Sequence, residues 1–121
     1  MINSAYVLIQ SCRAPYSSSY PIDALEAAFA ATNMGLELRF VFVGEGVLQL
    51  IQEQGNTSIA HKSIFKKLGA LPLFDIEKIY VQSTALSKYN VSIPQSMPNI
   101  ETVSDAKLAS LCQYAQHVLV F

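Results

Sequence analysis

The sequence predicts an α/β fold: a single-domain, three-layer sandwich built on a mainly parallel sheet of four to five strands. Short apolar runs of strand length alternate with stretches of helical periodicity along the chain, which is the pattern of repeated strand–helix–strand units. The run at 38–43 becomes continuously hydrophobic from Phe40, as expected for a parallel strand covered on both faces. With 121 residues the chain has the length of one domain, so we expect a single domain over 1–121.

The first part of the chain is expected to hold two strands and three helices. In chain order these are a strand at 5–10, a helix at 21–34, a strand at 38–43 and helices at 47–53 and 59–68. Pro21 suits the first turn of a helix, and Leu25 and Phe29 follow it at helical spacing. Gly35 and Gly69 stand where these helices end, as C-cap glycines do.

The second part alternates in the same way. The expected elements are a strand at 79–82, a helix at 83–89, a short strand at 101–103, a helix from 105 to about 115 and a strand at 117–121. Ser83 or a neighbour is expected to cap the first of these helices, and Ser104 with Asp105 to cap the second. Because such units cross over with one hand, the fold expected is a flavodoxin-like or Rossmann-like sandwich.

The chain is poor in charge for a soluble protein. Charged residues make up 14% of it, against about 25% in typical domains, while apolar residues make up 51% and the mean hydropathy is +0.30. No apolar run approaches the roughly 18 residues of a membrane span, and the run at 6–10 is too short for a signal peptide. We therefore predict a cytoplasmic protein without membrane association that buries part of its surface in an oligomer.

The helix expected at 21–34 supports an oligomer. Asp23 and Glu26 are its only charged residues, and alanines surround its apolar stripe. A helix with one face in water usually carries more polar side chains. Contact with a second subunit is the interpretation we favour, and an alanine-rich surface helix is the alternative.

Two cysteines, Cys12 and Cys112, are too few for a disulfide framework, and neither has a second Cys or His at the spacing of a zinc site. No metal is therefore predicted. Cys12 stands beside Arg13, whose positive charge favours the reactive thiolate, so Cys12 is the candidate thiol of the chain. Cys112 falls in an apolar helix and is interpreted as a packing residue.

Loops that follow the strands are candidate ligand sites, because parallel sheets bind ligands beyond the carboxyl ends of their strands. The loop at 11–20 has three consecutive serines before a helix N-terminus, which suits the phosphate of a flavin or nucleotide but lacks the usual glycines. The segment Gly44-Glu45-Gly46 lacks the third glycine of a dinucleotide fingerprint, so its glycines are interpreted as turn residues. His61 and His117 have no partner at a motif spacing, and no cofactor is predicted.

Several short signatures are spread over the chain. They are Asp23-Ala-Leu25, VFVGEGVLQL at 41–50, Lys67-Leu-Gly69, LFDIE at 73–77, Tyr80, Leu86 and HVLVF at 117–121. Together they resemble the DsrE/DsrF superfamily, and within it the TusC (DsrF-like) branch of sulfur-relay proteins. The resemblance covers nearly the whole chain and therefore implies a DsrE/DsrF-like fold.

The resemblance also implies partners and a site. Members of this branch are subunits of TusBCD-like complexes, heterohexamers in which TusB-like, TusC-like and TusD-like subunits pass persulfide sulfur towards 2-thiouridine at the tRNA wobble position. The relay cysteine of the TusD/DsrE branch lies at the end of the strand equivalent to 79–82, where this sequence has Gln82. Tyr80, Gln82 and Ser83 are expected to shape a pocket or a subunit contact there, without a catalytic residue.

Three functions remain open. The leading hypothesis is a non-catalytic structural subunit of a sulfur-relay complex, which meets tRNA only indirectly through its partners. The second is a stand-alone, homo-oligomeric sulfur carrier that uses Cys12. The third is a small flavin-binding or nucleotide-binding module that uses the loop at 11–20.

Overall fold

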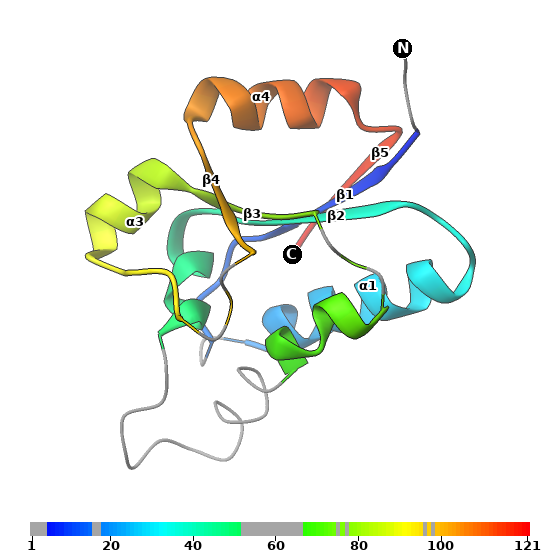
Figure 1. Cartoon of the computed structure of the whole chain (residues 1–121), viewed down its shortest axis with the longest axis horizontal. Coiled ribbons are helices and arrows are strands. Elements are labelled where there is room, and N and C mark those ends of the chain that lie inside the picture. The colour runs from blue at the N-terminus through cyan, green and yellow to red at the C-terminus, as the bar shows by residue number, and fades with distance from the viewer. Residues whose placement is uncertain are drawn as a thin grey trace.

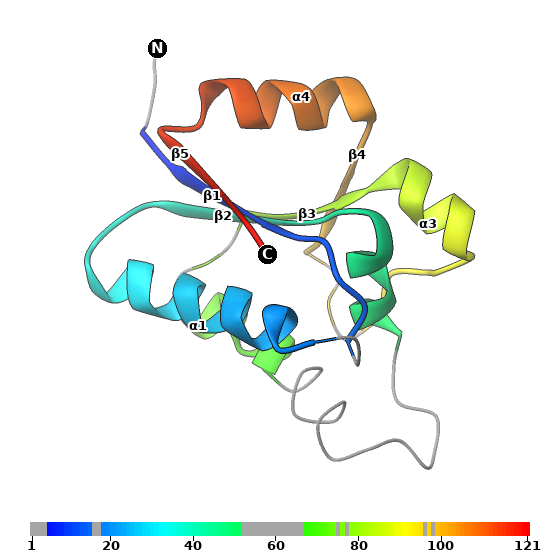
Figure 2. The same cartoon turned by 180° about the vertical axis from the view of Figure 1, so that it is seen from behind.

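A five-stranded parallel sheet is the middle layer of the protein in a computed structural model of the chain (Figure 1). The structure describes residues 5–15, 18–51, 67–74, 76, 78–95, 97 and 99–121. Helix α4 (Asp105–Tyr114) covers one face of the sheet, whereas α1 (Tyr20–Asn33) and the short helix η2 (Leu71–Phe74) lie on the other face (Figure 2). The three-layer sandwich predicted from the sequence is therefore confirmed.

The strands run in the order β4-β3-β2-β1-β5, and every neighbouring pair is parallel. Their bounds are β1 (Val7–Ser11), β2 (Leu38–Phe42), β3 (Lys78–Gln82), β4 (Glu101–Val103) and β5 (His117–Val120). The first four strands are added one beside the next, and the chain then crosses the sheet through α4 to place β5 next to β1 (Figure 1). Because the strands are parallel, the carboxyl ends of β1, β2, β3 and β4 lie side by side along one border of the sheet, called below the carboxyl-end edge.

Most helices and strands lie within two residues of their predicted bounds. Helix α3 (Ser83–Tyr89) has the predicted bounds, and its N-cap position is held by Gln82, the neighbour of Ser83. The helix predicted at 59–68 falls almost wholly outside the described residues, as does His61, and only its end is seen, as a helical turn at 67–69. Within the part of the chain that the structure describes, no helix is both long and apolar enough to cross a membrane.

The helix predicted at 47–53 differs in type and in position. The observed element, η1 (Gly44–Leu50), is a 3₁₀ helix that starts earlier than predicted, and Ile51 after it is extended. Residues three apart lie on the same side of a 3₁₀ helix. Val47 and Leu50 therefore both reach the core from one side of η1.

The sheet separates two apolar cores. The core on the α1 side includes Ile9, Leu25, Phe40, Phe42, Val47, Leu50 and Val81. The core on the α4 side includes Tyr6, Leu8, Val41, Tyr80, Val103 and Leu111. Successive residues of a strand point to opposite faces, so the middle of each inner strand is apolar on both faces because helices cover both.

Ser104 caps α4 as the sequence predicts, because its Oγ accepts a hydrogen bond of 3.1 Å from the backbone N–H of Lys107. Replacing Ser104 with Ala is expected to lower the free energy of unfolding by about 1 kcal/mol, since that N–H loses its partner. Urea unfolding followed by circular dichroism measures the loss, with Ser87→Ala on the exposed side of α3 as the control. Equal unfolding midpoints for the two variants would contradict the prediction.

Candidate functional site

Gln82 lies where the strand β3 turns into α3, at the carboxyl-end edge of the sheet. Its Oε1 accepts a hydrogen bond of 3.0 Å from the backbone N–H of Gly44, which opens η1 after β2. Its Nε2 donates a hydrogen bond of 3.0 Å to Oδ1 of Asp105, in the first turn of α4. The amide of Gln82 therefore joins three segments that are distant in the sequence, and both of its ends are engaged.

Asp105 is the second member of this cluster. Its Oδ1 also accepts a hydrogen bond of 3.0 Å from Oγ1 of Thr84, in the first turn of α3. The carboxylate lies in the first turn of α4, where the helix dipole stabilises negative charge. Sequence analysis assigned Asp105 only to the cap of α4. The signal that was missed is that the strand before Asp105 ends beside the strand that carries Gln82.

A shallow pocket opens beside this cluster. Its lining residues are Gly44, Gln82, Thr84, Ala85, Lys88 and Tyr89. Lys88 provides the one charged side chain of the lining and lies over the ring of Tyr89, 5.4 Å from the ring centroid. Of the three residues expected to shape a pocket or contact, Gln82 lines this pocket, whereas Tyr80 and Ser83 are not among its lining residues.

Tyr80 lies two residues before Gln82 and is buried under α4 in the core that contains Val41 and Leu111. Burial raises the pKa of the Tyr80 hydroxyl, and the nearby guanidinium of Arg39 opposes the rise. Arg39 also lies over the ring of Tyr6, 3.8 Å from its centroid. Tyr80 therefore serves as a neutral core residue at physiological pH. Ser83 is half-buried at the start of α3.

Cys12 follows β1 and is separated from β3 by β2. Burial raises the pKa of its thiol, and the charge of Arg13 lowers it by less. The guanidinium of Arg13 lies over the ring of Tyr20, 5.1 Å from its centroid. Arg13 therefore acts in the expected direction, but desolvation of the thiolate outweighs the nearby positive charge and raises the pKa of the Cys12 thiol overall.

Cys112 packs against the core on the α4 side, in agreement with the interpretation as a packing residue. Its Sγ also accepts a hydrogen bond of 3.0 Å from Nε2 of Gln10 in β1. This contact ties α4 to the sheet near its β5 edge.

The end of β1 is held by η1. Nε2 of the fully buried Gln49 donates hydrogen bonds to Oγ of Ser11 (2.7 Å) and to the carbonyl oxygen of Arg13 (3.0 Å). The two elements approach so closely that a Cβ atom on Gly46 would overlap the carbonyl group of Ser11. Gly44 has φ of +56°, so both glycines have the turn role that the sequence analysis gave them.

Ser18 and Ser19, which lead from the serine-rich loop into α1, both form side-chain hydrogen bonds. Oγ of Ser18 accepts a hydrogen bond from the backbone N–H of Tyr20, and Oγ of Ser19 donates one of 3.0 Å to Oδ2 of Asp23. The carboxylate of Asp23 in the first turn of α1 repels a phosphate at this position. Ser17, the first of the three consecutive serines in this loop, lies outside the described residues.

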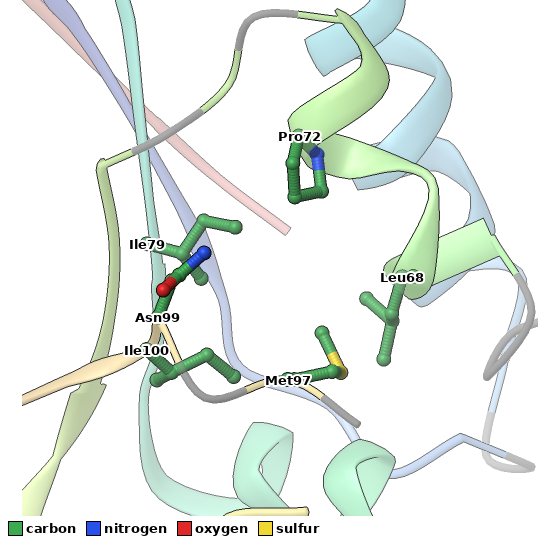
Figure 3. Close-up of a pocket in the computed structure, with 7 residues that line it drawn as sticks. Leu68, Pro72, Ile79, Met97, Asn99 and Ile100 are labelled. Carbon is green, nitrogen blue, oxygen red and sulfur yellow. The ribbon is translucent and has the colours of Figure 1, made fainter. Parts of the chain in front are cut away.

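A second pocket is apolar and lies near the amino end of β3, away from Gln82 (Figure 3). It is lined by Leu68, Gly69, Pro72, Ile79, Met97, Asn99 and Ile100. Leu68 and Pro72 face Ile79 and Ile100 across it (Figure 3). Because Asn99 gives this lining its one polar side chain, the pocket lacks the groups of a catalytic site.

Fold and site together define a Rossmann-type α/β sandwich. Its turn from β3 to α3 carries an amide, that of Gln82, which is hydrogen-bonded at both ends. The chain belongs to the DsrE/DsrF-like family, whose model matches residues 5–121. The family resemblance seen in the sequence is thereby confirmed.

Two relatives and one solved structure are similar to the chain. It is 29% identical over 108 residues to a "Protein TusC homolog" of Vibrio vulnificus (strain YJ016), covering 89% of this chain and 92% of the relative. It is 27% identical over 116 residues to the Pseudomonas aeruginosa "Protein TusC homolog", covering 96% and 98% of the two chains. The crystal structure of the ychN protein from E. coli has the same fold, with a TM-score of 0.76, 18% identity and coverage of 98% of this chain and 100% of that one.

Proposed function

We propose that this protein is a non-catalytic, structural subunit of a TusBCD-like sulfur-relay complex in the cytoplasm. The observation that carries the proposal is the amide of Gln82, which is hydrogen-bonded at both ends at the position where the family resemblance places the relay cysteine. The similarity to proteins named TusC homolog supports the same assignment. The complex as a whole passes persulfide sulfur towards 2-thiouridine at the tRNA wobble position.

The chemistry of the site supports a structural role. A persulfide carrier needs a thiolate, and an amide cannot bond sulfur covalently. Gln82 instead links the turn after β2, the start of α3 and the start of α4, which gives the carboxyl-end edge one fixed shape. A fixed edge costs little conformational entropy when a partner subunit binds it.

Cys12 does not replace the missing relay residue. It lies after β1, outside the pocket beside Gln82, and burial favours its neutral thiol. No observation favours the stand-alone carrier or the flavin-binding module over the structural subunit, since Asp23 occupies the helix N-terminus that a phosphate would need.

Co-expression with TusB-like and TusD-like subunits from the same genome tests the proposal. The expected result is one complex that contains all three chains and, after loading with labelled sulfur by a cysteine desulfurase, carries label on the TusD-like chain and none on this chain. Mass spectrometry of the separated chains locates the label, and a complex assembled with a Cys12→Ser variant is the control, expected to load equally. A chain that purifies apart from both partners would overturn the proposal.

A further inference from the structure

The strand β5 is an exposed apolar edge of the sheet. It pairs with β1 on one side and ends the sheet on the other. Val118, Leu119 and Val120 are 36%, 42% and 64% exposed, and Tyr114 before them is 71% exposed. The sequence from 108 to 121 contains no Asp, Glu, Lys or Arg. Natural edge strands usually carry a charge or a proline that prevents pairing with other strands, and β5 has neither.

The opposite edge of the same sheet is protected. Strand β4 is three residues long and carries the exposed Glu101 at its start. A short strand with a charged side chain is a poor template for another strand. The contrast between β4 and β5 within one sheet indicates that β5 is the edge that accepts a partner.

We propose that β5 pairs antiparallel with β5 of a second copy of this chain, about a two-fold axis perpendicular to the sheet. The two sheets then form one continuous sheet, and the two α4 helices lie on the same face of it. Such a self-complementary contact requires that the strand does not repel its own copy. A strand without charged side chains meets this condition, whereas one that carried several like charges would not.

The main chain of β5 sets the register of this pairing. The backbone N–H of Phe121 donates to the carbonyl oxygen of Gln10, and the carbonyl oxygen of Phe121 accepts from the N–H of Cys12, so Phe121 is directed towards β1. Residues of a strand alternate in the direction of their backbone groups. The N–H and C=O of Leu119 are consequently directed towards β1, and those of Val118 and Val120 are directed away from it, so Val118 is able to form a reciprocal pair of hydrogen bonds with Val120 of the second copy.

The side chains agree with that register. Leu119 is level with Ile9, which packs in the core on the α1 side, whereas Val118 is level with Leu8, which packs in the core on the α4 side. In an antiparallel pair, residues directly opposite each other share a face. Centring the pair on Leu119 places Leu119 against its own copy on one face and Val118 against Val120 of the copy on the other. Every apolar side chain exposed on β5 thereby meets an apolar partner.

Sedimentation equilibrium of the purified chain by itself tests the pairing and does not depend on the proposed function. The wild-type chain is expected to be a dimer at micromolar concentration. Leu119→Lys places two ammonium groups directly opposite each other and is expected to raise the dimer dissociation constant by about 100-fold or more. Thr102→Lys adds the same charge to the exposed β4 edge and is the matched control, expected to leave the dimer unchanged.

A cross-linking experiment tests the register and guards against misfolding of the lysine variant. In a chain with Cys12→Ser and Cys112→Ala, Leu119→Cys is expected to form an intermolecular disulfide on mild oxidation, because Cα atoms of a non-hydrogen-bonded antiparallel pair are about 4.5 Å apart. Thr102→Cys in the same background is expected to stay uncross-linked.

The outcomes separate this proposal from the functional one. A monomeric wild-type chain, a Leu119→Lys variant that stays dimeric, or equal cross-linking at Leu119→Cys and Thr102→Cys would each overturn the β5 pairing. A chain that is monomeric alone and assembles only with TusB-like and TusD-like subunits would also overturn it while supporting the proposed function. A β5 dimer that ignores both subunits would do the reverse.

Discussion

Replacing Gly46 with Ala is expected to lower the free energy of unfolding by about 3 kcal/mol, which is a large fraction of the stability of a domain of this size. A Cβ atom at this position would overlap the backbone carbonyl group of Ser11. A side chain could rotate away from such a contact, but a carbonyl at the end of an inner strand cannot. The chain therefore has to move η1 away from β1 to accommodate the methyl group.

The displacement breaks further contacts. Gln49 in η1 donates hydrogen bonds to Oγ of Ser11 and to the carbonyl oxygen of Arg13, and its side chain is fully buried. Moving η1 lengthens these hydrogen bonds and leaves buried polar groups without good partners, which adds to the cost of the clash. Val47 and Leu50, on the other side of η1, lose packing in the core at the same time.

Two other glycines provide matched controls for Gly46→Ala. Gly44→Ala meets open space but keeps φ at +56°, so a loss of about 1 kcal/mol is expected from backbone strain alone. Gly69→Ala lies in a helical turn and also meets open space, so stability is expected to stay the same or rise by up to about 1 kcal/mol.

Urea denaturation of the three variants measures these differences. The expected order of stability is Gly69→Ala, then Gly44→Ala, then Gly46→Ala, since only the last combines a backbone overlap with loss of the Gln49 contacts. A Gly46→Ala variant as stable as Gly44→Ala would show that η1 moves without cost and would contradict the close approach of Gly46 to Ser11.

The sequence was sufficient to predict the strands and the helices α1, α3 and α4, for physical reasons that particular residues illustrate. Inner strands such as β2 are apolar on both faces because helices cover both, and this gives a run of hydrophobic residues that is easily recognised. Capping residues such as Ser104 act locally, within one turn of a helix, so their role is visible in the sequence. Local causes are those that one sequence can reveal.

Contacts between distant segments could not be predicted in the same way. Gln82 and Asp105 are 23 residues apart, and their hydrogen bond exists because β3 and β4 are neighbours that both end at the carboxyl-end edge. The 3₁₀ geometry of η1 likewise depends on the side chains that β1 presents to it. The burial that keeps the Cys12 thiol neutral comes from packing, whereas the favourable effect of Arg13 was visible as a sequence neighbour.

Gln82→Cys is expected to give a poorly reactive thiol, because the carboxylate of Asp105 lies beside position 82. A helix N-terminus, such as that of α3, lowers the pKa of a cysteine and favours the thiolate. Asp105 opposes this effect, since it lies against the side chain of residue 82 and against Thr84. A like charge within about 4–6 Å disfavours the ionised form of its neighbour.

The double variant Gln82→Cys with Asp105→Asn is therefore expected to have a thiol pKa about one unit lower than Gln82→Cys alone. A lower pKa means more thiolate at neutral pH, so alkylation by iodoacetamide is expected to be up to about tenfold faster at pH 7. The rates are measured between pH 6 and about 10, in a background of Cys12→Ser and Cys112→Ala so that residue 82 is the one thiol present.

The control for Asp105→Asn is Glu101→Gln, which removes an exposed carboxylate at the other end of β4 and is expected to leave the alkylation profile of Gln82→Cys unchanged. Asn keeps an amide oxygen that can still accept from Thr84, so the comparison isolates charge from hydrogen bonding. Equal profiles with and without Asp105→Asn would mean that the carboxylate does not influence the position. The expected difference would mean that the carboxylate of Asp105 disfavours a thiolate at position 82, so that Gln82→Cys alone gives a less reactive thiol than the double variant.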